Sequence, residues 1–72
     1  MSAGVTWYSA SKGEDVEIAT MSLPQARNTL AKLLRGEATN SEGKRLPFSA
    51  EQVVRDALEQ RILGIEAERG QA

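Results

Sequence analysis

The pattern of apolar and polar positions predicts two short strands in the N-terminal third of the chain. Residues 4–10 contain consecutive β-branched and aromatic side chains, which favour extended backbone. Residues 16–23 are the second candidate strand, and a polar stretch with a glycine separates the two segments. Residues 1–15 therefore form either a loose arm or the first strand of a hairpin that turns around Lys12 and Gly13.

A first helix is expected to start at Ser22 and to end before Gly36. Ser22 and Gln25 have the spacing of a capping box, in which the serine hydroxyl accepts a hydrogen bond from the backbone N–H three residues later. Pro24 is tolerated in the first turn, where its missing N–H costs nothing. Apolar side chains then recur at helical spacing, and a glycine is a common helix end. This stripe consists of Ala26, Leu30, Leu33 and Leu34.

A second, longer helix is expected to begin near Ser49 and to run to about Glu68. Ser49 and Gln52 form another capping box, and Phe48 can pack on Val53 across the first turn as a hydrophobic staple. Its apolar stripe consists of Val54, Leu58, Ile62 and Ile65. The length of this stripe suggests more apolar surface than one chain of this size would cover.

The connection between the two expected helices, residues 36–47, is long for so small a chain. It is polar, includes glycine and proline, and carries no apolar stripe. We therefore expect residues 37–47 to be mobile. A single domain would span residues 16–69, and residues 70–72 would form a tail.

The length limits the chain to one small domain with a thin core. Folding of 72 residues hides only about 60% of the surface that the extended chain exposes. The sequence has no cysteine and no histidine, so disulfides and the commonest zinc ligands cannot staple the fold. A partner subunit is the obvious remaining way to bury more surface, and we expect a homodimer.

The same residue inventory is poor for catalysis. Without histidine or cysteine, the commonest general base and the thiol nucleophile are missing, and no glycine-rich phosphate loop is present. We therefore expect no enzyme, no cofactor and no metal. No apolar run reaches the ~18 residues of a membrane span, and the N-terminus lacks a secretory pattern, so a cytoplasmic location without a membrane segment is expected.

The charges are balanced overall but unevenly distributed. Nine basic and ten acidic residues give a net charge of −1, which argues against nucleic-acid binding by bulk charge alone. Residues 27–45 carry five basic and two acidic side chains, a net +3, whereas the segment from residue 51 onward carries three basic and five acidic ones, a net −2. A local basic patch is therefore compatible with the sequence.

Two junctions resemble a known family. Met21-Ser22-Leu23-Pro24 leads from the second expected strand into a helix, and the second helix opens with Ser49 followed by Val53-Val54-Arg55-Asp56-Ala57-Leu58. In this order they resemble the ribbon–helix–helix (Arc/MetJ/CopG-like) DNA-binding family, over about residues 16–35 and 48–65. The resemblance implies an α+β fold of one strand and two helices per chain, intertwined as a homodimer, with or without an extra N-terminal strand.

The resemblance also implies a function and a set of site residues. Paired strands would enter the major groove of double-stranded DNA, as in a transcriptional repressor or the DNA-binding part of an antitoxin, with a toxin as a further protein partner left open. If Ala19, Met21 and Leu23 face the core, the base contacts are Ile18, Thr20 and Ser22. The expected phosphate contacts are Arg27, Lys32, Lys44, Arg45, Ser49 and Ala50. The expected dimer core consists of Met21, Leu23, Val54, Leu58 and Ile62.

Two alternatives stay open beside this interpretation. The fold could be a ββαα miniature domain, in which Thr20 and Ser22 are a strand-surface and a cap residue. The function could be that of a small protein-binding or inhibitor module, which would use the N-terminal hairpin and the surface of Trp7 and Tyr8, because aromatic side chains anchor protein interfaces. The sequence does not indicate a target DNA or a pathway.

Overall fold

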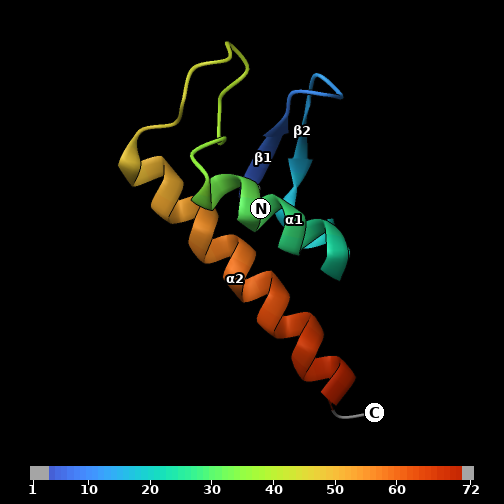
Figure 1. Ribbon diagram of the computed structural model, residues 1–72. Coiled ribbons are helices and arrows are strands. Elements are labelled where there is room, and N and C mark those ends of the chain that lie inside the picture. The colour runs from blue at the N-terminus through green and yellow to red at the C-terminus, as the bar shows by residue number, and fades with distance from the viewer. Residues whose placement is uncertain (1–3, 71–72) are drawn as a thin grey trace.

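The computed structural model describes residues 4–70 of the chain and shows a small α+β protein. Over these residues a two-stranded antiparallel sheet precedes two helices (Figure 1). The elements are β1 (Thr6–Ser9), β2 (Glu14–Glu17), the 3-10 helix η1 (Ile18–Thr20), α1 (Leu23–Leu34) and α2 (Phe48–Gly70). This order matches the ββαα alternative, and the first expected strand is one arm of a hairpin.

The hairpin turns where the sequence predicts. The backbone N–H groups of Lys12 and Gly13 both donate to the carbonyl oxygen of Ser9, at 3.2 and 2.7 Å. Gly13 has a φ of +67°, a conformation that glycine adopts without strain. Trp7 pairs with Val16 across the two strands, and both side chains therefore point to the same face of the hairpin.

The second expected strand is shorter than the pattern predicts. β2 ends at Glu17, and the chain then tightens into η1 instead of remaining extended to residue 23. The turn brings Ile18 and Met21 to the same side, where both are buried, whereas a strand would have placed them on opposite faces. Ala19, which we expected in the core, is exposed. Burial of two large apolar side chains explains why the chain turns here.

The start of α1 is confirmed. The Ser22 hydroxyl accepts a hydrogen bond from the backbone N–H of Gln25 at 3.4 Å, as the capping box predicts. The helix buries Leu23, Ala26, Thr29 and Leu33. It ends before Gly36, whose φ of +83° continues the chain in a conformation that other residues rarely adopt.

The second helix starts at Phe48, two residues before the position that a cap at Ser49 predicts. The backbone N–H of Glu51 donates to the carbonyl oxygen of Pro47, so Pro47 and not Ser49 stands at the capping position. Phe48 is 73% exposed and Val53 is 54% exposed, so the expected staple between them does not cover either side chain. α2 has 23 residues, about 34 Å at 1.5 Å per residue.

The connection between α1 and α2 forms a hydrogen-bonded turn. Thr39 and Arg45 form an isolated antiparallel bridge, and the Asn40 side-chain oxygen accepts from the backbone N–H groups of Glu42 and Lys44. Ala38 is fully buried. The connection therefore contributes one residue to the core, and the expected mobility of residues 37–47 stays a prediction.

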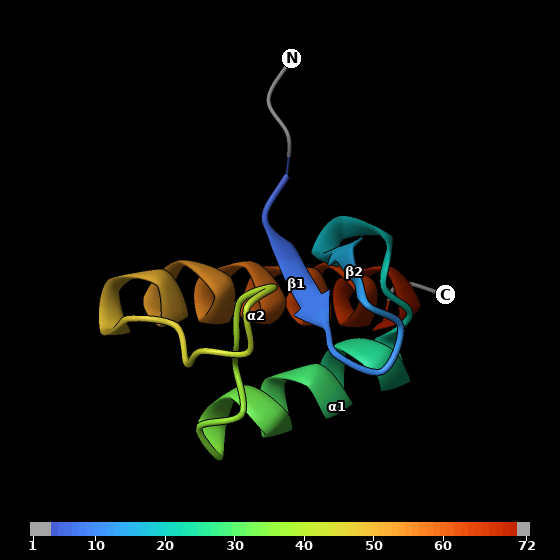
Figure 2. The ribbon, with the colours of Figure 1, turned by 90° about the horizontal axis from the view of Figure 1, so that it is seen from above.

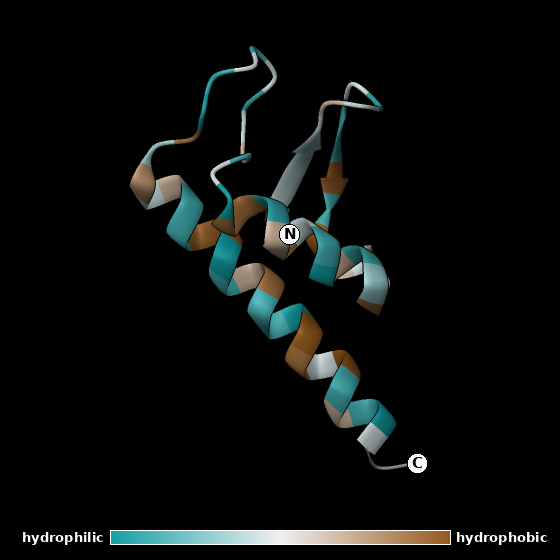
Figure 3. Ribbon diagram, in the orientation of Figure 1, coloured by the Kyte–Doolittle hydropathy of each residue, from teal (hydrophilic) through white to brown (hydrophobic). Residues whose placement is uncertain are grey.

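The helices pack side by side with the hairpin above them. Figure 2 shows α1 next to α2, and the hairpin and the connection project from the same side of this pair in Figure 1. Hydrophobic positions recur along the whole of α2, including its C-terminal half (Figure 3). The central core comprises Trp7, Ile18, Met21, Ala26, Leu33, Ala38, Val54 and Leu58. Over residues 4–70, no helix combines the length and hydropathy needed to cross a membrane.

Candidate functional site

The first candidate surface is a cleft between the hairpin and α1, which we name the hairpin cleft. Its volume is about 440 Å³, within the range of small-molecule pockets. Trp7 and Val16 of the hairpin, together with Met21, provide the apolar part of its lining. Polar side chains complete it: Ser9, Ser11 and Lys12 come from the hairpin, and Gln25, Asn28 and Lys32 come from α1. This cleft could hold a ligand that has both apolar and polar surface.

The hairpin cleft is positively charged. Lys12 and Lys32 line it, and no carboxylate does. Within the part of the chain that the structure describes, neither lysine forms an ion pair. Residues Leu23–Leu34 of α1 include no acidic side chain. Glu14 shares its strand face with Val16, and Glu37 interacts electrostatically with Lys32, but neither carboxylate lines the cleft, so the cleft favours an anion.

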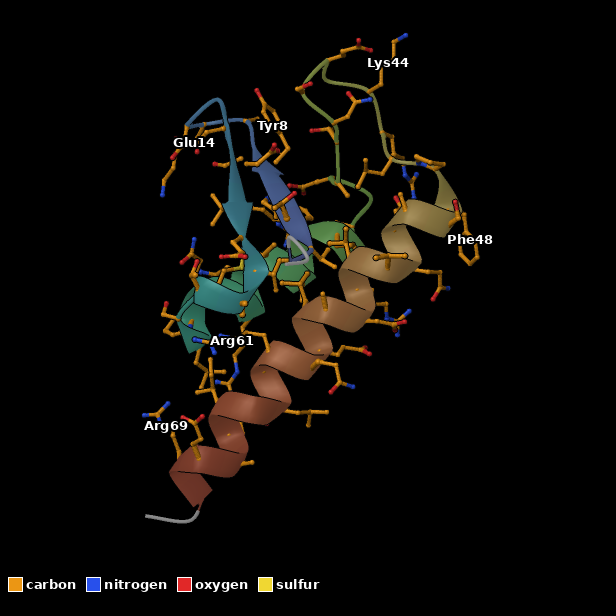
Figure 4. All side chains as sticks on the ribbon, turned by 180° about the vertical axis from the view of Figure 1, so that it is seen from behind. Tyr8, Glu14, Lys44, Phe48, Arg61 and Arg69 are labelled. Carbon is orange, nitrogen blue, oxygen red and sulfur yellow. The ribbon has the colours of Figure 1, made fainter. Side chains whose placement is uncertain are left out.

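The second candidate surface is a row of apolar side chains on the outside of both helices, which we name the apolar strip. It consists of Leu30, Leu34, Phe48, Ile62 and Leu63. Leu34, Phe48 and Leu63 are 61%, 73% and 58% exposed, and the Phe48 side chain extends away from the start of α2 (Figure 4). Leu30, Ile62 and Leu63 border one shallow cavity, and Leu34 and Phe48 border another. Helical spacing places this strip on the flank of α1 opposite to the hairpin cleft.

The charged side chains beside the apolar strip are paired within the chain. Arg27 Nη2 lies 2.6 Å from Glu66 Oε2, which joins the first half of α1 to the end of α2. Arg55 Nε lies 3.2 Å from Glu59 Oε2, and Arg45 pairs with the first turn of α2 at 3.0 Å. The border of the strip therefore carries balanced charge.

The residues expected to read DNA bases do not form one outward row. Ile18 is buried in the core, because η1 turns it inward. The Thr20 hydroxyl donates to the carbonyl oxygen of Glu17 at 2.8 Å, and the Ser22 hydroxyl caps α1. The expected extended backbone is wrong for Ile18 and Thr20, which lie in η1, whereas Ser22 is extended, so the common orientation of the three residues is lost.

The residues expected to contact phosphate are spread over α1, the connection and α2. Arg27 and Arg45 are paired with carboxylates, and Ser49 and Ala50 lie in the first turn of α2. Lys44 lies at the outer end of the connection, away from the helices (Figure 4). Lys32 lines the hairpin cleft. The structure does not gather the six residues on one surface.

The residues expected in a dimer core are mostly covered by their own chain. Met21, Leu23, Val54 and Leu58 are buried in the described part of one chain, and Ile62 is partly buried against the same core. The hairpin and η1 supply the cover that a second chain was expected to give. Dimerisation itself stays a prediction, and a dimer would have to form through a face other than these core residues.

The surface expected around Trp7 and Tyr8 is also changed by the fold. Trp7 belongs to the core, and Tyr8 lies on the other strand face, where it borders a cavity together with Thr39 and Leu46 of the connection. The apolar strip was missed because Leu30 and Leu34 were assigned to the buried stripe of their helix. Two sequence signals could have indicated it: Leu63 lies outside the stripe of α2, and Phe48 precedes it.

Arg35 and Glu37 form a charged pair after the end of α1. The Arg35 side chain donates a 2.8 Å hydrogen bond to Glu37 and thereby lowers the pKa of that carboxyl group. The stability from this pair is present above the ordinary glutamate pKa and lost as the pH falls through the lowered value. Both side chains are exposed, which is typical of a surface pair. The described residues contain no cluster of three acidic side chains placed to hold a metal ion.

Comparisons with known proteins assign no family to the chain. No protein-family model matches it, and neither a curated protein nor a solved structure is significantly similar to it. The resemblance to ribbon–helix–helix proteins therefore rests on the junction residues alone. The two surfaces of this chain must support any functional argument.

Proposed function

We propose that the chain is a small protein-interaction module that associates with a second copy of itself through the apolar strip. The observation that carries this proposal is the exposure of Leu34, Phe48 and Leu63, each by more than half, beside the partly buried Leu30 and Ile62 of the same strip. A group of apolar side chains exposed together marks an interaction site more often than single exposed ones do. A second copy brings an identical strip and covers both at once.

The gain from covering the strip is comparable to the cost of association. Full burial of a large apolar side chain contributes about 1.5–3 kcal/mol, and Leu34, Phe48 and Leu63 have more than half of their surface still to bury. A symmetric dimer would cover six such side chains at about 1–2 kcal/mol each, or roughly 6–12 kcal/mol, against an association cost of about 4–15 kcal/mol. The balance favours a reversible dimer of chains that fold on their own.

The charges around the strip favour a second copy over a strongly charged partner. Each of Arg27, Arg45 and Arg55 is already paired with a carboxylate, so two copies bring no excess of like charge together. Nucleic acid and acidic membranes would instead require unpaired basic residues beside the strip. Two antiparallel helix pairs packed on their apolar faces would form a four-helix arrangement.

The ribbon–helix–helix fold and its role as a DNA-binding repressor or antitoxin stay hypotheses. Such a dimer would require β2 of two copies to pair along their free edges. Ile18 and Thr20 would then need another backbone conformation than the one in η1. In the present conformation Ile18 is buried, and base contacts by the exposed Thr20 and Ser22 stay a hypothesis.

Sedimentation velocity over a hundredfold range of protein concentration tests the proposal. We expect the wild-type chain to shift reversibly from monomer to dimer, and Leu63→Glu to remain monomeric, because the introduced carboxylate would be buried in the interface without a partner. Val53→Glu is the matched control: Val53 is 54% exposed on the same helix but does not border either cavity of the strip.

The circular dichroism spectrum and the unfolding midpoint of both variants should show that each remains folded. A wild-type chain that stays monomeric at the highest concentration would contradict the proposal. A dimer that survives Leu63→Glu but dissociates with Val53→Glu would place the interface elsewhere. Binding of an unrelated partner to the monomer, without self-association, would also overturn the proposal as stated.

A further inference from the structure

The hairpin cleft has a shape and a charge that self-association through the apolar strip does not use. Lys12 lies in the hairpin turn and Lys32 lies in α1, so the fold brings two lysines from distant sequence positions to the lining of one cavity. The cavity has no carboxylate in its lining. An anionic ligand that enters it would meet attraction from two sides.

Hydroxyl groups add hydrogen-bond donors beside the lysines. Ser9 Oγ and Ser11 Oγ lie 3.3 Å apart, so one hydroxyl donates to the other and one hydroxyl hydrogen of the pair stays free. The Ser22 oxygen accepts from a backbone N–H, which leaves its own hydrogen free to donate. Phosphate offers enough acceptor oxygens to use several such donors together, and charge-assisted hydrogen bonds to it are strong.

The remaining lining suits a flat, partly apolar group with polar edges. The half-buried Val16 and the 8% of Trp7 that stays exposed provide the apolar and aromatic surface, because Met21 is only 1% exposed; surface of this kind contacts nucleobases in proteins. Gln25 and Asn28 are exposed amides on the cleft side of α1. Such amides donate and accept hydrogen bonds at base edges, and the adenine edge is their usual partner.

We propose that the hairpin cleft is a nucleotide-binding site, with Lys12, Lys32 and the serine hydroxyls on the phosphate and the base against Val16 and the exposed part of Trp7. The ligand is either a free nucleotide or one nucleotide of a single strand, because both present the same phosphate and the same unstacked base. A base inside a duplex is stacked between its neighbours and cannot reach the apolar part of the cleft. The proposal does not depend on dimerisation, since the apolar strip lies on the other flank of α1.

An NMR titration of the full chain tests the site directly. Trp7 lines this cleft and is the only tryptophan of the sequence, so its indole N–H gives a single resonance that responds to binding there. The probes are adenosine 5′-monophosphate, adenosine, inorganic phosphate, a short adenine-rich single-stranded DNA and the corresponding duplex. We expect the monophosphate to shift the indole resonance saturably, and adenosine and phosphate to bind much more weakly, because each supplies only part of the contacts.

Matched variants distinguish binding in the cleft from a general effect of positive charge on the protein surface. Lys12→Gln and Lys32→Gln should each raise the dissociation constant for the monophosphate roughly three- to fivefold, on the scale of one exposed charge pair, and together roughly tenfold or more. Lys44→Gln removes the same charge from the connection, outside the cleft, and should leave the dissociation constant unchanged (Figure 4). All three lysines are exposed, so the variants should fold normally.

The titration results distinguish the two sources of the nucleotide and can overturn the proposal. A single strand that binds more tightly than the monophosphate would identify the single strand as the source of the nucleotide, and the reverse would identify the free nucleotide. No shift of the indole resonance by either, equal effects of adenosine and its monophosphate, or equal losses in Lys32→Gln and Lys44→Gln would overturn the proposal. Duplex binding that matches single-strand binding would also overturn it, because it would show contact with the backbone only.

Discussion

Leu58→Ala tests whether one chain closes its own core. Leu58 is 0% exposed in the middle of α2, in contact with a core drawn from every element of the single chain. The substitution removes three carbon atoms, worth about 0.8 kcal/mol each in transfer free energy, and leaves a cavity that adds to the loss. We therefore expect about 3–4 kcal/mol of destabilisation. A domain of this size has about 3–5 kcal/mol in total, so the variant should be largely or partly unfolded at room temperature.

Urea unfolding followed by circular dichroism, at protein concentrations a hundredfold apart, is the assay. The expected loss of stability is about the same at both concentrations, because the contacts of Leu58 lie within one chain. Leu63→Ala is the control: that side chain is 58% exposed, and its truncation should cost less than about 1 kcal/mol in the dilute, monomeric sample. A loss in Leu58→Ala that disappears on dilution would refute the reasoning, since it would place Leu58 in an interface between chains.

Four further substitutions test local features. Ser22→Ala removes the cap of α1 and should lower the free energy of unfolding by about 1 kcal/mol, as measured by urea titration. Gly36→Ala should lower the thermal stability more than Gly13→Ala. Both glycines have positive φ, but only at Gly36 would the new Cβ contact another side chain, at 3.3 Å. Thermal unfolding of the two variants would show the difference. Arg61→Gln should cost about 1 kcal/mol by losing a 2.8 Å hydrogen bond to the backbone carbonyl oxygen of Met21, and an unchanged midpoint would contradict this.

The helices and the hairpin could be predicted because their signals are local. Ser22, Gln25 and the glycine after α1 define that helix from neighbouring residues, and Gly13 supports the turn between β1 and β2. The end of β2 could not be predicted in this way. The apolar residues of the expected strand lie at both odd and even positions, so the alternation does not indicate which face is buried. Only the rest of the core determines that Ile18 and Met21 are buried together.

The candidate surfaces could be predicted only in part. Lys32 and Ser22 were named from the sequence, and both line the hairpin cleft, but the residues that complete it come from the hairpin turn and depend on how the hairpin packs against α1. The sequence indicates the buried stripe of α2, but it does not indicate which residues cover this stripe. A stripe shows that a helix is covered, but it does not show whether the cover is the same chain or a second copy.

The most direct test of self-association through the apolar strip is an isotope-filtered NMR experiment on a mixture of labelled and unlabelled chains at high concentration. It detects only contacts between different copies. We predict that such contacts connect the methyl groups of Leu34 and Leu63 with the ring of Phe48, and that none involves Leu58. Inter-chain contacts to Leu58, or a dimer without contacts at the strip, would contradict the account.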